Sequence, residues 1–147
     1  MAWREPTEDD LAATLSREEI ESYRQDGDFT TDPVATLLRR TAARVRGDIR
    51  SNGNVRLSPG EYELPESVIS AAMDYAAADV LKRLNVPMNE DRRKAREDAL
   101  ALFQRIAEGR YTPESHGAGE TESSSGPAAV VVCAARPRVT SKNLEGL

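Results

Sequence analysis

The chain is nearly without histidine and cysteine, two residue types that many active sites use. Its 147 residues include one cysteine and one histidine, Cys133 and His116. A single cysteine excludes an internal disulfide and fits a reducing compartment. No stretch of about 18 apolar residues is present to span a bilayer, and the first residues lack the basic and then apolar profile of a signal peptide. We therefore expect a protein that stays in the cytoplasm and does not contact a membrane.

Motifs with a defined chemistry are lacking as well. The sequence contains no glycine-rich phosphate loop, zinc-ligand spacing or dinucleotide fingerprint. His116 lies in a segment that we expect to be flexible, so the usual general base is missing. Cys133 lies in an apolar run, where a thiol behaves as a small hydrophobe. Acidic pairs such as Asp9-Asp10 and Glu18-Glu19 lack the oxygen spacing of a calcium loop and are better explained as helix caps. We predict no catalytic residue, cofactor or metal, and hence no enzyme.

The overall charge is acidic. A formal net charge of -5 and an isoelectric point near 5.0 argue against broad electrostatic capture of nucleic acid or of an anionic membrane. Hydrophobic residues make up 39% of the chain and charged residues 31%, a balance that predicts a folded body together with an unfolded part. The simplest division is one domain plus a tail.

Two short helices are predicted near the N-terminus. The first opens at Thr7, whose hydroxyl can cap a turn that carries three carboxylates. Ser16 and Glu19 have the spacing of a capping box, in which each side chain bonds the other residue's free amide. The second helix should therefore run from Ser16 towards Tyr23.

Three long helices are predicted after these. The step Asp32-Pro33 is a strong start signal, and an apolar stripe at helical spacing follows it, made of Val34, Leu38, Ala42, Val45 and Ile49. Residues 55–63 alternate loosely and predict a small hairpin or an ordered loop. Pro65-Glu66 and Asn89 open the other two helices, and Gly109 ends the last one. Because each helix is apolar on one side only, residues 1–111 should form a mainly α, small helical bundle.

The composition changes abruptly after Tyr111. Residues 112–127 contain no large aliphatic side chain and are dominated by Gly, Ser, Glu, Thr and Pro, so we interpret 112–128 as a flexible linker. Residues 129–134 form a β-branched run with the composition of a buried strand. Since the tail offers no second strand to pair with it, we expect residues 129–147 to be an extended arm that docks on another subunit. The alternative is that the arm folds back on its own bundle.

The helix that begins at Pro33 carries an unusual number of arginines. At about 100° per residue, Arg39, Arg46 and Arg50 fall within about 40° of each other. This face could line a path for DNA phosphates or carry charge between subunits. The alternative is a solvated face whose arginines pair with acids on neighbouring helices. A second functional hypothesis follows, a small helical DNA-binding regulator.

The layout resembles a known family, the head-to-tail adaptor proteins of long-tailed bacteriophages and related gene transfer agents. The acidic start Thr7-Glu8-Asp9-Asp10-Leu11, the helix at an Asp-Pro step and the two further core helices are similar to members of this family. The ending resembles the proline-arginine-valine ending of the Mu-like branch, in the sequence Arg136-Pro137-Arg138-Val139-Thr140-Ser141-Lys142-Asn143-Leu144.

The resemblance implies a ring of about twelve copies in the virion neck, assembled in the bacterial cytoplasm. The ring would lie between the portal protein and the stopper or tail-completion protein, and DNA would pass through its lumen without sequence-specific binding. The arm would add a strand to a portal sheet, with Arg136 and Arg138 on acidic groups and Pro137 ending the pairing. The docking residues would then be Val130, Val131, Val132, Arg136, Pro137, Arg138, Val139, Leu144 and Leu147.

Overall fold

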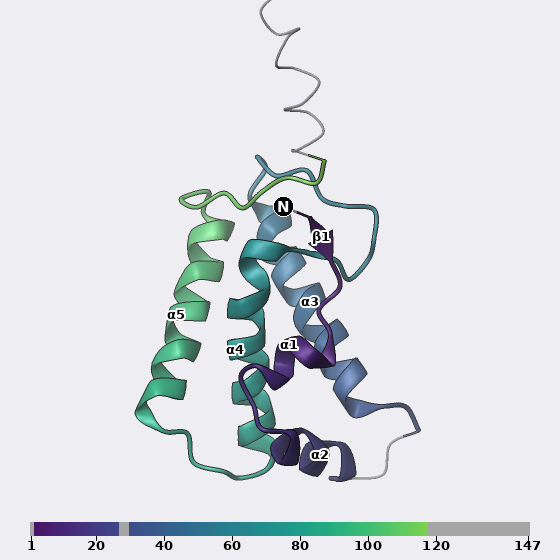
Figure 1. Ribbon diagram of the computed structural model, residues 1–147. Helices are drawn as coiled ribbons and strands as arrows, with labels where there is room; N and C mark the ends of the chain where they lie inside the picture. Colours follow the sequence, from purple (N-terminus) through teal and green to yellow (C-terminus); the bar gives the residue numbers. More distant parts are fainter. Residues whose placement is uncertain (1, 27–29, 118–147) are drawn as a thin grey trace, which may run out of the picture. The chain divides into compact units, whose positions relative to one another are not determined.

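The fold is mainly helical (Figure 1). The computed structural model describes residues 2–26 and 30–117. In chain order its elements are β1 Trp3–Arg4, α1 Glu8–Ala12, α2 Arg17–Gln25, α3 Pro33–Ser51, β2 Leu64–Pro65, α4 Glu66–Arg83 and α5 Glu90–Ala107. The helices α3, α4 and α5 pack side by side, and the short helices α1 and α2 lie against α3 and α4. The prediction of a small bundle with two short and three long helices is confirmed for this part of the chain.

Local capping signals place most of the helix starts. The amide of Glu19 donates to Ser16 Oγ at 3.1 Å and the amide of Ser16 donates to Glu19 Oε1 at 3.2 Å, which is the predicted capping box. Thr7 and Asp10 form a second box at α1. Asp32 and Asn89 cap α3 and α5 through their side-chain oxygens. Acidic residues therefore serve as caps here, as the sequence indicates.

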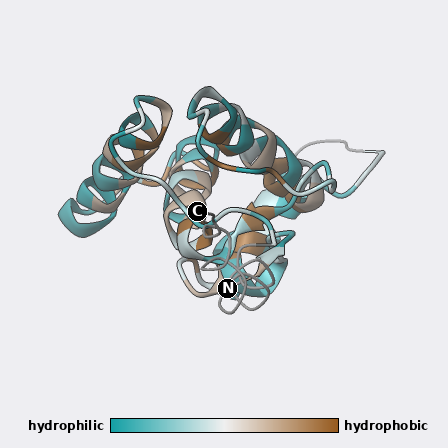
Figure 2. Cartoon of the chain, turned by 90° about the horizontal axis from the view of Figure 1, so that it is seen from above, coloured by the Kyte–Doolittle hydropathy of each residue, from teal (hydrophilic) through white to brown (hydrophobic). Residues whose placement is uncertain are grey.

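One apolar core joins all five helices. Seen from above in Figure 2, apolar segments of the helices face inward and polar ones face outward. The predicted stripe of α3 is buried in full, and α4 buries residues around most of its circumference. On α5, Ala99, Phe103 and Ile106 are buried, whereas Leu100 and Leu102 are only partly covered. Within residues 2–26 and 30–117, no helix is both long and apolar enough to cross a membrane.

A two-stranded sheet that the sequence does not predict ties the N-terminus to the middle of the chain. The strands β1 and β2 are antiparallel, with Trp3 opposite Pro65 and Arg4 opposite Leu64. The amide of Glu66 also donates to the carbonyl of Ala2 at 3.1 Å. Residues 55–63 form a loop without strands, so the ordered loop rather than the hairpin is correct.

The body extends beyond the point at which the composition changes. Asn52 Nδ2 donates to the carbonyl of Tyr111, and the amide of His116 donates to the carbonyl of Arg56 at 2.8 Å. Residues 2–116 form one compact unit, so the end predicted at Tyr111 is five residues too early. Figure 1 shows this segment, in green, crossing the end of the bundle. Because its backbone groups are bonded to distant residues, a linker that starts at residue 112 is a wrong prediction.

The predicted docking arm lies outside the described residues. This holds for every position that the sequence assigns to it, namely Val130, Val131, Val132, Arg136, Pro137, Arg138, Val139, Leu144 and Leu147. Cys133 and the remainder of the predicted linker, from residue 118 to 128, also lie there.

Candidate interaction surfaces

Arg46 is buried, which overturns its predicted place on an exposed arginine face. It is 7% exposed, although Arg39 and Arg50 on the same helix are exposed. Its Nη1 atom donates to the carbonyl of Glu63 at 2.7 Å, and its guanidinium lies 5.7 Å from the centre of the Trp3 ring. Burial lowers its pKa from the ordinary value. The helical angle predicts the correct side of α3 for Arg46, but the loop of residues 52–63 covers this side chain.

The exposed side of α3 still carries cations. We call Arg39, Arg40 and Arg50, with the small residues Ala43 and Gly47 between them, the α3 basic face. None of the three arginines forms an ion pair with a residue that the structure describes, and Arg39 lies 5.7 Å from the ring centre of Tyr62. Of the predicted face, Arg39 and Arg50 therefore do not show the alternative, pairing with acids of neighbouring helices, among the described residues. A Cβ atom added at Gly47 would meet nothing within 4 Å, so the middle of the face is open.

Arg44, on the edge of the same helix, is engaged differently. Its Nε atom lies 4.0 Å from Asp48 Oδ2, and its guanidinium lies 4.8 Å from the ring centre of Tyr75. Asp48 Oδ2 is buried without a hydrogen bond, and burial raises the pKa of this carboxyl group. Arg44 therefore belongs to the contact between α3, α4 and α5 rather than to the open face.

A groove runs between α4 and α5 on another side of the body. It consists of two hollows of about 270 Å³ and about 410 Å³, which share Asp74 and Ala95. We call it the α4–α5 groove. The first hollow is lined by Thr14, Asp74, Ala77, Ala78, Leu81, Met88, Asn89, Asp91, Arg92 and Ala95. The second hollow is lined by Ser67, Ser70, Ala71, Asp74, Ala95, Asp98, Ala99, Leu102 and Arg105. Most of these side chains are small or apolar.

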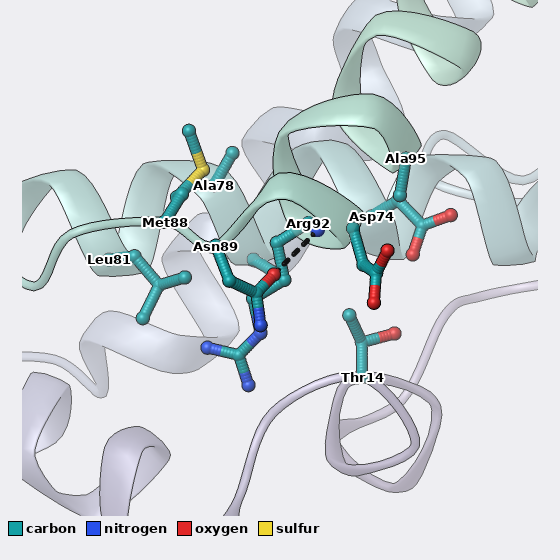
Figure 3. Close-up of a pocket in the computed structure, with 10 residues that line it drawn as sticks. Thr14, Asp74, Ala78, Leu81, Met88, Asn89, Arg92 and Ala95 are labelled. Atoms are coloured by element: carbon teal, nitrogen blue, oxygen red, sulfur yellow. Dashed lines mark hydrogen bonds between the residues drawn. The ribbon is translucent and has the colours of Figure 1, made fainter.

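Asp74 is the unusual residue of this groove. Figure 3 shows its carboxylate directed towards Thr14, beside the residues of α5. The side chain is half-buried and forms no hydrogen bond or ion pair with any residue in ranges 2–26 and 30–117. Burial alone raises the pKa of this carboxyl group above its ordinary value. A carboxylate that loses water without gaining a partner is destabilising, so Asp74 favours a cation or a hydrogen-bond donor from outside.

The charge of the groove is negative. Asp91 and Asp98 add two carboxylates to that of Asp74. Arg92 does not neutralise them, because its Nη1 atom is bonded to Glu19 at 2.9 Å. Arg105, at the far end, is the remaining cation of the lining. The groove therefore suits an occupant that is basic and presents small side chains.

Compared with protein-family models, curated proteins and solved structures, the chain matches none of them. Its function is therefore inferred from its own surfaces and from its sequence.

The last residues of the body are held in place by Glu114. The carbonyl of Glu114 accepts a hydrogen bond from Trp3 Nε1 at 3.0 Å, and its carboxylate accepts from the amide of Ser67 at 3.1 Å and from the Ser67 hydroxyl. The His116 ring meets the Trp3 ring edge-on at 6.4 Å. We call residues 112–116 the exit strap. Nothing in the local sequence signals it, because every partner lies about 45 or more positions away.

Metal ligands do not converge in the part of the chain that is described. No group of three or more His, Cys, Asp or Glu side chains there is placed to hold an ion. Of the acids that the sequence offers as pairs, Asp10 and Glu19 are used as helix caps. The His116 ring packs on Trp3, and His116 forms no ion pair with an acid in residues 2–26 and 30–117.

Proposed function

We propose that this chain is a virion structural protein, a head-to-tail adaptor that forms a ring between the portal and the stopper or tail-completion protein. The ring would let DNA pass through its lumen, and the chain would perform no catalytic step. This proposal places it in the neck of a virion that is assembled in the bacterial cytoplasm. Its support is the sequence resemblance together with the relation between the body and the tail.

The observation that carries the proposal is that the core of the body is complete without the tail. The buried cluster runs from Trp3 to Ile106 and draws on all five helices. Only two large hydrophobic side chains of the described part are exposed, Val86 at 40% and Tyr111 at 38%. The apolar run at residues 129–134 is therefore not needed to close this core. A β-branched segment with this composition favours pairing with a sheet edge on another protein.

The tail also starts from a fixed point on the body. The exit strap is bonded to Trp3 and Ser67, so residue 117 follows directly on an anchored segment. The 30 residues after it reach at most about 100 Å when fully extended. A tether of this kind raises the local concentration of the arm at any protein that the body already contacts. Repetition around a ring would multiply the effect.

The alternative, a DNA-binding regulator, loses one of the three arginines on which it depends. Arg46 is 7% exposed, and its Nη1 atom is bonded to Ser58 and Glu63. Arg39 and Arg50 remain exposed, but the net charge of -5 opposes DNA capture. No other observation favours this alternative.

Removal of the arm tests the adaptor proposal. Portal rings of the same virus are immobilised, and three chains are compared: the full chain, a chain lacking residues 128–147, and a full-length chain in which 129–134 is replaced by Gly and Ser. We expect the deletion and the replacement to weaken binding by at least about tenfold, or about 1.4 kcal/mol. A full chain that does not bind portal rings contradicts the adaptor, and undiminished binding of the truncated chain contradicts the role of the arm.

A further inference from the structure

The α4–α5 groove and the α3 basic face are complementary in charge. The groove presents Asp74, Asp91 and Asp98, whereas the face presents three arginines without ion pairs to described residues. We propose that the α4–α5 groove of one copy receives the α3 basic face of a second copy, so that copies join head to tail. The inference rests on the proposed function, because it supplies the contact between neighbours in the ring.

Asp74 gives this contact its most favourable interaction. An arginine placed on its carboxylate would form charge-assisted hydrogen bonds in a site partly shielded from water. Exposed ion pairs are usually worth little, but a carboxylate that is already partly desolvated in the free protein loses less hydration when the pair forms. Arg40 and Arg50 are suitable donors, because the structure gives neither of them an ion pair among the described residues.

The two surfaces also match in length and in side-chain size. The groove residues of α4, from Ser67 to Leu81, span about 21 Å of helix, and Arg39 to Arg50 span about 17 Å. The groove is lined by alanines on both α4 and α5. Between its arginines the α3 face offers Ala43 and Gly47. Small residues at a helix contact let the helix axes approach closely, so the arginine side chains can reach the acids at the edges of the groove.

The position of the surfaces favours a head-to-tail contact. At about 100° per residue, the groove residues of α4 are centred on Asp74. Four residues of α4 that are 0% exposed, Val68, Ala72, Ala76 and Val80, are centred on the opposite side of the helix. The basic face is the side of α3 that is turned away from the core. Two different and complementary patches on one chain form a heterologous contact, which closes into a ring when the rotation between copies permits.

A complementation experiment with two variants tests this contact in the full chain. The groove variant is Asp74→Lys, and the face variant combines Arg40→Glu with Arg50→Glu. Each variant loses one surface and keeps the other. We expect the wild-type chain to associate with rising concentration at low salt, and each variant alone to associate at least about tenfold more weakly. Mixed in equal amounts, the two variants should form a 1:1 complex and nothing larger, measured by sedimentation velocity.

Controls separate charge from position. Glu97→Lys changes the net charge by +2, as Asp74→Lys does, and Lys82→Glu combined with Lys94→Glu changes it by −4, as the face variant does. All three positions are exposed and lie outside the groove lining, so these controls should leave association unchanged. Ala43→Gln adds bulk without charge to the middle of the basic face and should weaken association. Circular dichroism of each variant verifies that the helices are retained, and Asp74→Asn replaces Asp74→Lys if the lysine variant does not fold.

Several outcomes overturn the contact. A wild-type chain that stays monomeric up to about 1 mM excludes it, and so do variants that associate like the wild type or a mixture that gives no 1:1 complex. Association that survives the face variant but is lost on removal of residues 128–147 would make the basic tail the occupant instead. No portal is present in this experiment. A negative result would therefore contradict the contact between copies but would not contradict docking on the portal, which the binding experiment with portal rings tests separately.

Discussion

Arg46 and Ser58 are joined twice: Nη1 of Arg46 donates to Ser58 Oγ at 3.2 Å, and Nη2 donates to the carbonyl of Ser58 at 3.0 Å. A third hydrogen bond, from Nη1 of Arg46 to the carbonyl of Glu63, connects the end of the same loop to α3. The planar guanidinium thus fixes both ends of residues 58–63 on α3. The loop in turn positions β2, which pairs with β1.

The first prediction follows from these bonds. Arg46→Ala leaves two carbonyls and a hydroxyl without a donor, and we expect it to lower the free energy of unfolding by about 3 kcal/mol. Arg46→Lys should recover less than half of this loss, because an ammonium cannot reproduce the fork geometry. Urea denaturation at neutral pH measures both changes. The matched control is Arg50→Ala, an exposed arginine of the same helix, which should change stability by less than about 0.5 kcal/mol.

Arg46 also shows why the fold was easier to predict than its surfaces. The caps at Ser16 and Asp32 and the stripe of α3 depend on residues a few positions apart, so local sequence determines them. The burial of Arg46 depends on a loop that begins six positions later and folds back. A helical wheel gives the angle of a side chain but not what covers it.

The same distinction explains the sheet and the groove. Strands of two residues, such as Trp3–Arg4, have no period that a sequence pattern can reveal. By residue type alone, nothing in the sequence distinguishes Asp74 from the other acids of this alanine-rich helix. Its exposure to a groove depends on how α5 packs against α4, which only the tertiary structure specifies. The sequence signal that could have drawn attention to it is an acid within an otherwise apolar stretch, residues 71–78.

The second prediction concerns where the body ends. Trp3 is the sole tryptophan, it is 8% exposed, and its indole N–H is bonded to Glu114. A chain that ends at Tyr111 loses this bond and the His116 ring, so its fluorescence emission should shift to longer wavelength. A chain that ends at Gly117 should keep the emission of the full chain. Equal spectra for the two truncated chains would contradict the role of the exit strap.

The third prediction is a loss of stability in acid that depends on Asp10. Its carboxylate is bonded to Arg4 at 2.7 and 2.9 Å, and this partner lowers its pKa from 3.8 to about 2. Because the pKa is lower in the folded state, the stabilisation is present above about pH 4 and is lost as the pH falls towards 2. Asp10→Asn should lower stability at pH 7 by about 1 kcal/mol and should change it much less at pH 2. Unfolding midpoints across this range measure the difference.

The fourth prediction is that Asp74→Asn raises the thermal stability of the isolated body at neutral pH. Burial raises the pKa of Asp74, so the folded state binds its proton more tightly than the unfolded state does. The resulting penalty is absent below the ordinary carboxyl pKa and grows as the pH rises through the raised value. The gain from asparagine should therefore appear at pH 7 and vanish near pH 3. Glu97→Gln, at an exposed position of α5, is the control and should show no such dependence. If Asp74→Asn lowered stability at pH 7, an internal partner of Asp74 would be implied and the groove would not need a cation from a second copy.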